Sequence, residues 1–401
     1  MPMISYSDAL ALVLEQHLDF GTEEILLTET YGRVLAEDIH ADRDFPPFNR
    51  ATKDGIALRY EAVENGRLSF EIAGVLAAGQ PVIPLEEQES CVEIMTGAVV
   101  PYETDTVVMY EHLTVEGDIA TLQKIPERGQ NIHLKGSDHK KGDLILPKNT
   151  RIGAAEMGIL ATVGKDKVPV RRLPKIAVIS TGNELVDVGD TPMLHQIRRS
   201  NTYSLYGALQ ELGIRPMLLH IDDDVDLMRQ KLSYLIDEMD VLILSGGVSK
   251  GKFDYLPQVL EELKVKKIFH RVAQRPGKPF WFGKNESLST LVFSFPGNPV
   301  STFLNYYLYF IPWFCKSACL SYERQFVRLS NMVENRSDLT IFKGANLMIK
   351  EGDTVVEMVD SSGSGDLAHL SEISGFVQLD PRDMAYQAGQ IVPYIAVKNV
   401  I

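Results

Sequence analysis

Long hydrophobic runs are absent from this sequence of 401 residues. No apolar stretch reaches the ~20 residues that a helix needs to cross a bilayer, so no membrane span is expected. The first residues also lack the basic and apolar regions of a secretory signal peptide. Cysteine is scarce: the chain has three, an odd number that argues against a disulfide framework and fits a reducing compartment. We therefore expect a cytoplasmic protein.

An excess of positive charge is also lacking. With 40 basic against 54 acidic residues the formal net charge is -14, whereas nucleic-acid surfaces are basic. No nucleic-acid partner is expected, although Arg271, Arg275 and Lys278 could form a local basic pocket.

Cys315 and Cys319 lie one helical turn apart in an apolar segment without a His or Cys pair nearby. We expect buried thiols there rather than a metal or redox site.

The residue pattern changes along the chain, and its length favours several domains. Helices are expected at 5–20 and 153–163, with a β-rich stretch of short alternating runs at about 45–140 between them. From residue 175, strands alternate with helices, which implies a parallel sheet covered by helices on both faces. Residues 326–401 return to short strands and turns and predict a small all-β module. The fold class expected is multi-domain α/β plus β.

Loops rich in Gly, Pro, hydroxyl and charged residues follow the predicted strands of the α/β part. The loops are Ser180-Thr181-Gly182-Asn183-Glu184, Asp222-Asp223-Asp224, Ser245-Gly246-Gly247-Val248-Ser249 running to Asp254, Arg275-Pro276-Gly277-Lys278-Pro279 and Phe295-Pro296-Gly297-Asn298-Pro299. The carboxyl ends of parallel strands share one edge of an open sheet, and ligands bind in the crevice there. Five such loops therefore predict a site for a phosphorylated or otherwise anionic ligand.

Individual loops suggest particular chemistry. Amides and hydroxyls of 180–184 could hold an oxyanion, and Glu184 could coordinate a metal ion or orient a substrate hydroxyl. The loop 245–249 permits close backbone approach but lacks the Gly-Lys-Ser/Thr ending of a P-loop. Arg275 and Lys278 suit a tetrahedral oxyanion, because Arg binds it bidentately and Lys acts as a point charge. Helix capping by 180–184 or Asp254, and a plain surface turn at 275–279, remain the structural alternatives.

The run Asp222-Asp223-Asp224 precedes a predicted amphipathic helix. At least one of these residues is expected to cap that helix. Three carboxylates exceed the need for capping, so we expect Asp223 or Asp224 to contact a metal ion or the substrate. From the residue pattern alone, we therefore predict an α/β domain that binds an anion and a metal ion.

Taken together, the motifs resemble the molybdopterin molybdenumtransferase family, which includes bacterial MoeA-type enzymes and the corresponding C-terminal half of gephyrin. The matching motifs of the α/β part are Ser180-Thr181-Gly182-Asn183-Glu184-Leu185, Ser245-Gly246-Gly247-Val248-Ser249 with Asp254, Pro276-Gly277-Lys278-Pro279 and Pro296-Gly297-Asn298-Pro299-Val300-Ser301. The matching upstream motifs are Asp54-Gly55-Ile56-Ala57, Ile94-Met95-Thr96-Gly97-Ala98 and Arg128-Gly129-Gln130-Asn131-Ile132 with Gly136-Ser137-Asp138. The resemblance covers nearly the whole chain in one order.

The resemblance implies a four-part architecture. Residues 1–44 with 141–174 would form an elongated N-terminal arm, and 45–140 a β-rich insertion module. Residues 175–325 would form a central doubly wound parallel-sheet domain of the molybdopterin-binding type, and 326–401 a C-terminal β-barrel. A homodimer is also implied, in which the active site lies between the α/β domain of one subunit and the β-rich module of the other.

The resemblance further implies that molybdate is inserted into the dithiolene of adenylylated molybdopterin, with release of AMP and with Mg²⁺ as cofactor. The implied catalytic residues are Glu184, Asp223, Asp254 and Lys278, and the implied metal ligands are Glu184, Asp223, Asp224 and Asp254. The implied substrate contacts are Asp54, Thr96, Arg128, Asp138, Ser180, Thr181, Gly182, Ser245, Gly246, Gly247, Ser249, Arg275, Pro296, Gly297, Asn298, Pro299 and Ser301. A pterin-adenylylating enzyme and molybdoenzyme-maturation proteins are the partners it suggests.

The sequence departs from the family pattern at three places. Lys53 stands where the family usually has Met, and Arg275 where it usually has Lys. The C-terminal module has Asn335-Arg336 and Phe342-Lys343 in place of a Gly-Arg and Phe-x-Arg segment. A divergent paralogue with another oxyanion is therefore one alternative. Two others are a molybdopterin adenylyltransferase of the same α/β fold, which the extra modules disfavour, and a non-catalytic gephyrin-like scaffold, which the acidic loops disfavour.

Overall fold

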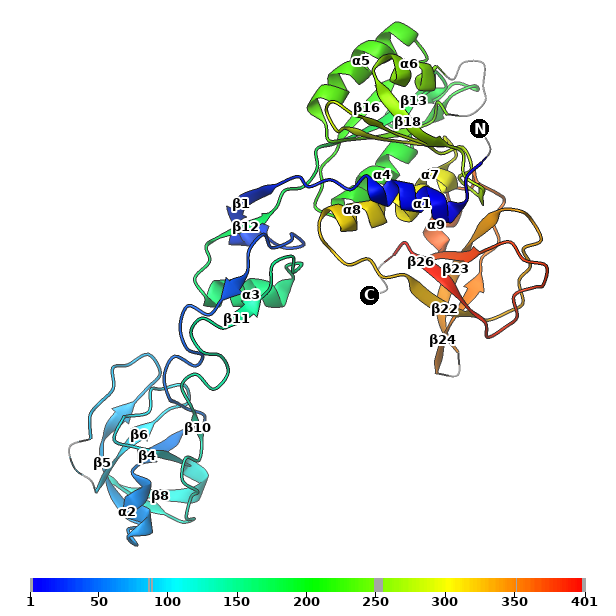
Figure 1. Cartoon of the computed structure of the whole chain (residues 1–401). Coiled ribbons are helices and arrows are strands. Elements are labelled where there is room, and N and C mark those ends of the chain that lie inside the picture. Colours follow the sequence, from blue (N-terminus) through cyan, green and yellow to red (C-terminus); the bar gives the residue numbers. More distant parts are fainter. Residues whose placement is uncertain (1–2, 86, 88, 249–254, 351, 399–401) are drawn as a thin grey trace. The chain divides into compact units, whose positions relative to one another are not determined.

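The computed structural model describes residues 3–85, 87, 89–248, 255–350 and 352–398 (Figure 1). The chain folds into two compact units. The first comprises Met1–Glu24, Gly32–Ala36 and Pro169–Ile401, and the second comprises Ile25–Tyr31 and Glu37–Val168. Among the described residues, no helix has the length and apolar character needed to span a bilayer. The division into four parts that the resemblance implies stays a prediction.

The second unit is built around a six-stranded sheet of order β7-β4-β6-β5-β9-β8. Its strands are β4 (Gly55–Leu58), β5 (Ser69–Leu76), β6 (Ser90–Ile94), β7 (Thr106–Met109), β8 (Leu113–Glu116) and β9 (Ile119–Leu122). Successive residues point to opposite faces of a strand, and here both faces are packed: Ile56 and Leu58 join one apolar cluster, and Ala57 joins the other. The β-rich pattern predicted for this stretch is thus confirmed.

Short elements complete this part of the chain. They are β1 (Thr22–Leu26), η1 (Leu27–Glu29), β2 (Ile39–His40), β3 (Arg50–Ala51), α2 (Tyr60–Glu64), η2 (Tyr110–His112), β10 (Ile132–His133), β11 (Leu144–Leu146), α3 (Ala154–Thr162) and β12 (Lys167–Arg171). Three two-stranded sheets pair β1 with β12, β3 with β10 and β2 with β11. The predicted helix 153–163 is α3.

The first unit contains a second six-stranded sheet, of order β16-β13-β17-β21-β20-β18. Its strands are β13 (Ile176–Thr181), β16 (Met217–Ile221), β17 (Val241–Ser245), β18 (Val265–His270), β20 (Trp281–Asn285) and β21 (Leu291–Phe295). The predicted parallel pairing is confirmed for β13, β16, β17 and β21. Strand β20 runs antiparallel to both neighbours, because loops rather than crossover helices connect it to β18 and β21.

Helices cover both faces of this sheet (Figure 1). Helices α5 (Val225–Glu238) and α6 (Leu256–Glu262) pack on the face that carries Ala177 and Ile179. The other face, with Ile176 and Val178, packs against further helices of this unit. These are α1 (Tyr6–Glu15), α4 (Asn201–Gln210), α7 (Pro299–Asn305) and α8 (Ile311–Ser317). Helix α1 is shorter than the predicted 5–20, and Trp313 Nε1 donates a hydrogen bond to the Gln16 carbonyl just beyond its end (2.9 Å).

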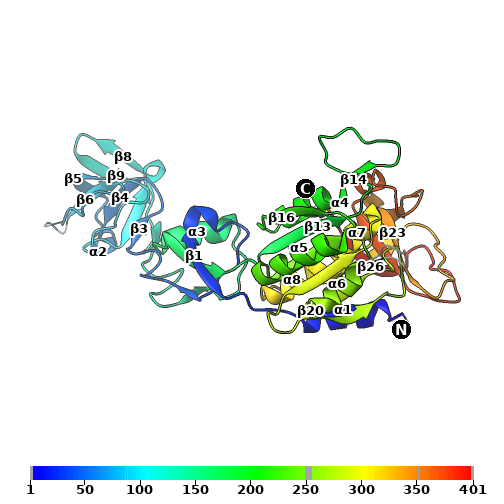
Figure 2. The same cartoon turned by 90° about the horizontal axis from the view of Figure 1, so that it is seen from above.

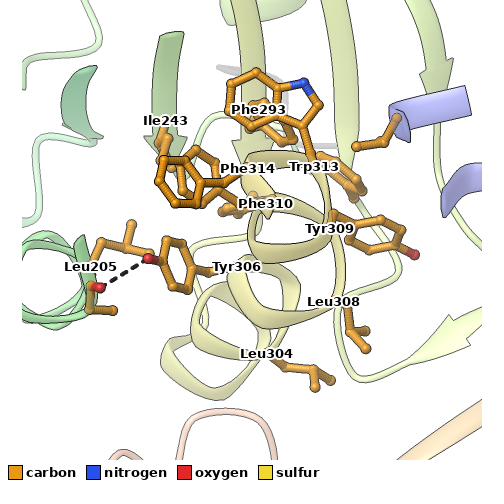
Figure 3. Close-up of a cluster of buried hydrophobic side chains, with 14 of the residues drawn as sticks. Leu205, Ile243, Phe293, Leu304, Tyr306, Leu308, Tyr309, Phe310, Trp313 and Phe314 are labelled. Atoms are coloured by element: carbon orange, nitrogen blue, oxygen red, sulfur yellow. Dashed lines mark hydrogen bonds between the residues drawn. The ribbon is translucent and has the colours of Figure 1, made fainter. Parts of the chain in front are cut away.

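The long apolar helical segment that begins at Pro299 contains a π-helical turn, η3 (Tyr306–Phe310), between α7 and α8. Pro312 follows it and has no N–H for the helical ladder, which favours such a local change of winding. The turn gathers aromatic rings beneath the sheet (Figure 3): Trp313 lies 5.4 Å from Phe310 and 5.5 Å from Phe293 between ring centroids. Tyr306 Oη donates to the Ala208 carbonyl at 3.0 Å, which ties this helix to α4.

The C-terminal part is a closed five-stranded β-barrel. Its elements are β22 (Gln325–Leu329), β23 (Thr340–Lys350), β24 (Asp353–Met358), α9 (His369–Glu372), β25 (Gly375–Leu379) and β26 (Ile391–Ala396). The order β23-β24-β22-β26-β25 closes because β25 also pairs with β23. A two-residue strand from the α/β part, β19 (Gln274–Arg275), joins β23 in parallel, so that Arg275 pairs with Ile341.

The prediction of buried thiols at the end of α8 is wrong for Cys319, which is exposed, while Cys315 is half-buried. The helix ends at Ser317, and Cys319 adopts a left-handed conformation with φ of 58°. The Leu320 N–H donates back to the Cys315 carbonyl at 2.8 Å. This is a helix-terminating turn, and it directs Cys319 away from the core.

Candidate functional site

The predicted loops open at one edge of the α/β sheet. Four of them follow β13, β16, β17 and β21, which run parallel. The fifth follows β18, which has the same direction as β21 because both are antiparallel to β20. From β13 the chain passes to β16 on one side and then to β17 on the other. Such a reversal leaves a crevice at the carboxyl ends, where open α/β sheets bind ligands.

A cavity of about 490 Å³ lies at this crevice, and we call it the switch-point cavity. The predicted site residues that line it are Ser180, Thr181, Gly182, Glu184, Asp223, Ser245, Gly246, Gly247, Pro296, Gly297, Asn298 and Pro299. Two further predicted residues, Ser249 and Asp254, lie outside the described residues. The loops after β13, β17 and β21 therefore meet as predicted.

Glycines let the loop after β17 approach the end of β13. Gly246 and Gly247 have φ of 104° and 70°, conformations that other residues rarely adopt. A β-carbon at either position would lie 3.0 Å from Thr181 Oγ1. That hydroxyl is buried and has no hydrogen-bond partner among the described residues. The glycines thus allow the loop to lie against Thr181, and the predicted close approach to a ligand stays a prediction.

Asn201, the first residue of α4, was missed by sequence reasoning. Its Nδ2 donates to Ser245 Oγ at 2.8 Å and to the Gly297 carbonyl at 2.7 Å. One amide therefore ties the loop after β17 to the loop after β21. No local pattern marks Asn201, because both partners are distant in sequence.

Two carboxylates line the switch-point cavity, those of Glu184 and Asp223. A β-carbon at Gly182, whose φ is 130°, would lie against the Glu184 carboxylate, so the glycine leaves room for it. Asp223 and Asn183 are linked: the Asp223 N–H donates to Asn183 Oδ1 at 3.0 Å, and Asp223 Oδ2 accepts from the Asn183 N–H at 3.4 Å. These contacts hold the loops after β13 and β16 together.

Asp224 caps α5, as predicted for one residue of the acidic run. Its Oδ1 accepts a hydrogen bond from the Leu227 N–H at 2.8 Å. The described residues contain no group of three or more His, Cys, Asp or Glu side chains placed to hold a metal ion. Of the predicted metal ligands that the structure describes, only Glu184 and Asp223 line the cavity.

A basic pair at the rim of the cavity was also missed. Arg198 and Arg199 line the cavity between β15 (Ile197–Arg198), which pairs with β14 (Leu185–Val186), and α4. Figure 2 shows the segment after β14 looping away from the sheet. Arg199 Nη2 lies 2.7 Å from Asp187 Oδ2, and hydrogen bonds from the Val188 N–H and Arg199 lower the pKa of Asp187. The two adjacent arginines in the sequence were the available signal.

Arg275, Lys278 and Ser301 line a different cavity of about 760 Å³, which we call the cationic cavity. It lies between the loop that contains β19 and the C-terminal barrel, from which Lys343 and His369 contribute. Pro279, Pro296 and Asn298 line both cavities. The predicted binding residues are thus divided between two cavities that share a wall.

A buried hydrogen-bond network holds the loop that carries the two cations. Gln274 Nε2 donates to the Pro276 carbonyl at 3.0 Å and to Asn305 Oδ1 at 2.8 Å. Asn305 Nδ2 donates to the Gly277 carbonyl at 3.2 Å, and Tyr309 Oη donates to Gln274 Oε1. Gln274, Asn305 and Tyr309 are fully buried. The loop is therefore a supported element, not a plain surface turn.

In the second unit, the structure brings together Asp54 and Thr96. Asp54 Oδ1 accepts from both the N–H and the Oγ1 of Thr96, each at 2.7 Å. The backbone hydrogen bond from Thr96, followed by that from its side chain, lowers the pKa of Asp54. The carboxylate is thereby held ionised at the start of β4.

Arg128 and Asp138 each have other partners. Arg128 Nη2 lies 2.9 Å from Glu64 Oε2, and its guanidinium lies 5.3 Å from the centre of the Tyr60 ring. Asp138 Oδ1 accepts from His133 Nε2 at 2.8 Å. Arg50 Nη2 approaches His133 Nδ1 at 3.1 Å and can only donate, so the proton of a neutral His133 lies on Nε2.

Replacing His133 by alanine is expected to raise the pKa of Asp138. The His133 hydrogen bond is the largest cause that lowers this pKa. A carboxyl whose pKa is lower in the folded state stabilises the fold above its unfolded pKa, and that contribution is lost as the pH falls through the folded pKa. NMR titration of the Asp138 carboxyl carbon measures the change. His112→Ala, which alters a histidine elsewhere in this unit, should leave the Asp138 curve in place, and an unchanged Asp138 curve in His133→Ala would contradict the assignment.

Two family models match this chain. Residues 4–164 match the family model described as the MoeA N-terminal region, domains I and II. Residues 177–314 match the model described as a probable molybdopterin binding domain. A molybdopterin molybdenumtransferase from Synechocystis is 36% identical over 398 residues, covering 98% of this chain and 100% of the relative. One from Staphylococcus epidermidis is 31% identical over 410 residues, covering 99% and 96%.

A solved structure shares the fold over nearly the whole length. The crystal structure of a molybdopterin biosynthesis MoeA protein from Pyrococcus horikoshii aligns with a TM-score of 0.83 at 29% identity. The alignment covers 99% of this chain and 100% of that chain. The similarity therefore includes the modules outside the α/β domain.

Proposed function

Because this chain belongs to the molybdopterin molybdenumtransferase family, we propose that it acts in molybdenum cofactor biosynthesis by inserting molybdate into adenylylated molybdopterin, with release of AMP. The observation that carries the proposal is the pair of cavities at one sheet edge. One combines hydroxyl, glycine and carboxylate groups with Arg198 and Arg199, and the other is lined by Arg275, Lys278 and Lys343. Such a division suits a phosphorylated substrate beside a small oxyanion.

The switch-point cavity is proposed to bind the adenylylated pterin. Gly246 and Gly247 expose backbone at a strand end, where closely spaced amides favour phosphate oxygens. The unpartnered Thr181 hydroxyl and the Ser180 hydroxyl add polar groups to the same wall. Arg198 and Arg199 supply positive charge at the rim. These residues would orient the phosphoanhydride before it is cleaved.

Glu184 and Asp223 are the residues proposed to hold Mg²⁺. Magnesium is usually bound by one or two carboxylates together with water and substrate phosphate oxygens, and a pair of cavity-lining carboxylates fits that donor set. When bound there, Mg²⁺ would polarise the phosphate that is cleaved. Asp254, the third acidic residue of the family pattern, lies outside the described residues.

The cationic cavity is proposed to concentrate molybdate. Arg275 and Lys278 stand on a loop whose backbone is held in place by buried side chains, so little backbone ordering is left for the moment of binding. Lys343 supplies a third cation from β23. The lysine-to-arginine departure at 275 retains the charge, so this departure from the family pattern leaves the cavity cationic.

The rival adenylyltransferase is separated from this proposal by one assay. The purified full chain is supplied with adenylylated molybdopterin, Mg²⁺ and molybdate, and AMP is measured. We expect AMP release that depends on molybdate and no formation of adenylyl-molybdopterin from ATP and molybdopterin. The opposite pair of results would support the adenylyltransferase, and neither activity would support a scaffold.

We also propose a homodimer in which Asp54, Thr96, Arg128 and Asp138 of one subunit complete the site of its partner. Co-expression of an Asp54→Asn chain with a Glu184→Gln chain tests this. In a mixed dimer both defects fall on one site and the other site is intact. Random pairing makes about half of the dimers mixed, so about a quarter of wild-type activity is expected. Each variant expressed alone should stay inactive. Absence of recovery in purified mixed dimers would contradict sharing.

The proposed reaction gives the protein a place between two other activities. A pterin-adenylylating enzyme would supply the substrate, and proteins that mature molybdoenzymes would receive the metallated product. A cytoplasmic location suits both transfers and remains a prediction from the sequence.

A further inference from the structure

One histidine in the wall of the cationic cavity has an unmet hydrogen-bonding need. His369 lines the cavity, and the residue is only 3% exposed. Its Nδ1 is buried and has no hydrogen-bond partner among the described residues. Buried polar atoms are nearly always paired in native proteins, and an unpaired one calls for an explanation such as a ligand.

The ring is held in place by its surroundings. Gly344 on β23 lies against it, and a β-carbon at 344 would overlap the His369 ring at Nε2 and Cε1. The His369 backbone N–H donates to Asp366 Oδ1 at 3.3 Å. Asp366 in turn accepts from the Ser362 N–H at 3.2 Å. A glycine on one side and an anchored backbone on the other therefore fix the imidazole in the cavity wall.

The charges of the cavity indicate which ligand would approach this ring. Arg275, Lys278 and Lys343 line it with three positive charges against one negative charge from Asp360. Asp366 already accepts hydrogen bonds from three donors at the base of α9. A cavity with this balance favours a small anion. An anion would supply the acceptor that an imidazole N–H lacks.

We infer that His369 is a ligand-binding residue of the cationic cavity, and that its imidazole N–H hydrogen-bonds a tetrahedral oxyanion held by Arg275 and Lys278. The inference rests on the proposed function, which makes molybdate that oxyanion. The cations attract the anion, and the ring adds a directional donor from the barrel side. Gly344 is the residue that makes space for it.

The inference is tested by titrating the full chain with sodium molybdate in a calorimeter. A hydrogen bond to a charged partner contributes enough that its loss in His369→Leu should raise the Kd for molybdate about 10- to 100-fold. His369→Gln keeps an N–H donor and should recover most of the affinity. Gln378→Leu is the matched control: Gln378 is also buried with an unpartnered oxygen in the same barrel but lines neither cavity.

Kinetics separate binding from a merely structural role. His369→Leu should raise the KM for molybdate and leave kcat and the KM for adenylylated molybdopterin near wild type. Gly344→Ala should weaken molybdate binding in a chain that keeps His369. Combining it with His369→Leu should add little, because both changes remove the same contact.

Equal affinity in wild type and His369→Leu would overturn the inference, as would equal weakening by His369→Leu and Gln378→Leu. Wild-type AMP release without measurable molybdate binding to any variant would also overturn it while leaving the proposed function standing. Loss of molybdate-dependent AMP release from the wild type would instead remove the proposed function.

Discussion

Glu184→Gln is expected to lower the rate of molybdate-dependent AMP release by about 10²- to 10³-fold, the range seen when one electrostatic contact to a reacting group is lost. Glu184 lines the switch-point cavity. Because residue 182 is glycine, it has no side chain that would crowd the Glu184 carboxylate. The amide has the shape of the acid without its charge. Steady-state assays with adenylylated molybdopterin measure the effect, and the Mg²⁺ concentration for half-maximal rate should rise with it.

Asp224→Asn is the matched control for this experiment. Asparagine caps a helix about as well as aspartate, so the hydrogen bond to the Leu227 N–H can be kept while a nearby charge is removed. We expect activity close to wild type, because Asp224 is used as a cap. Similar losses in Glu184→Gln and Asp224→Asn would point to the net charge of the region, and full activity in Glu184→Gln would refute its assigned role.

Gly277→Ala is expected to destabilise the first unit by about 3 kcal/mol, the sum of backbone strain and overpacking. Gly277 has a φ of 91°, and an added β-carbon would overlap the side chains of Asn305 and Gln274. These side chains are fully buried and cannot move without breaking the network under the cationic loop. Chemical denaturation followed by tryptophan fluorescence is suitable, since both tryptophans, Trp281 and Trp313, lie in this unit.

Gly352→Ala is the control that separates the cost of backbone strain from the cost of side-chain overlap at Gly277. Gly352 has nearly the same φ, 90°, but among the described residues, its chain neighbours aside, no atom lies within 4 Å of the position of an added β-carbon. Gly352→Ala should lower the free energy of unfolding only by the cost of the left-handed backbone, about 1 kcal/mol. If both variants lost the same stability, the crowding at Gly277 would have no role.

Local sequence patterns were sufficient to predict most elements of the α/β part and the sheet edge where its loops meet. The alternation of strands and helices fixes the direction of β13, β16, β17 and β21, and direction alone brings their loops together. The same reasoning could not separate the switch-point cavity from the cationic cavity. That separation depends on the two-residue strand β19 pairing with β23, and two residues carry no periodic signal.

Side chains that support the site were the least predictable. Gln274 is 31 residues from Asn305 and 35 from Tyr309 in sequence, and the three side chains meet only in the folded chain. Asn201 likewise joins partners more than forty residues away. Nothing in the neighbouring sequence distinguishes these polar residues from helix-surface ones. Their roles emerge only from the folded chain.

The pairing of β19 with β23 limits how this chain can be divided or recombined. The segment that ends in Arg275 lies in the chain between β18 and β20 of the α/β sheet, but it pairs with β23 of the barrel wall. A barrel taken from another protein would therefore bring its own β23 and reset the position of Arg275. Exchange of the C-terminal module is in effect exchange of one wall of the cavity proposed to bind molybdate, and if that proposal holds, chimaeras should inherit oxyanion preference from the donor of the barrel.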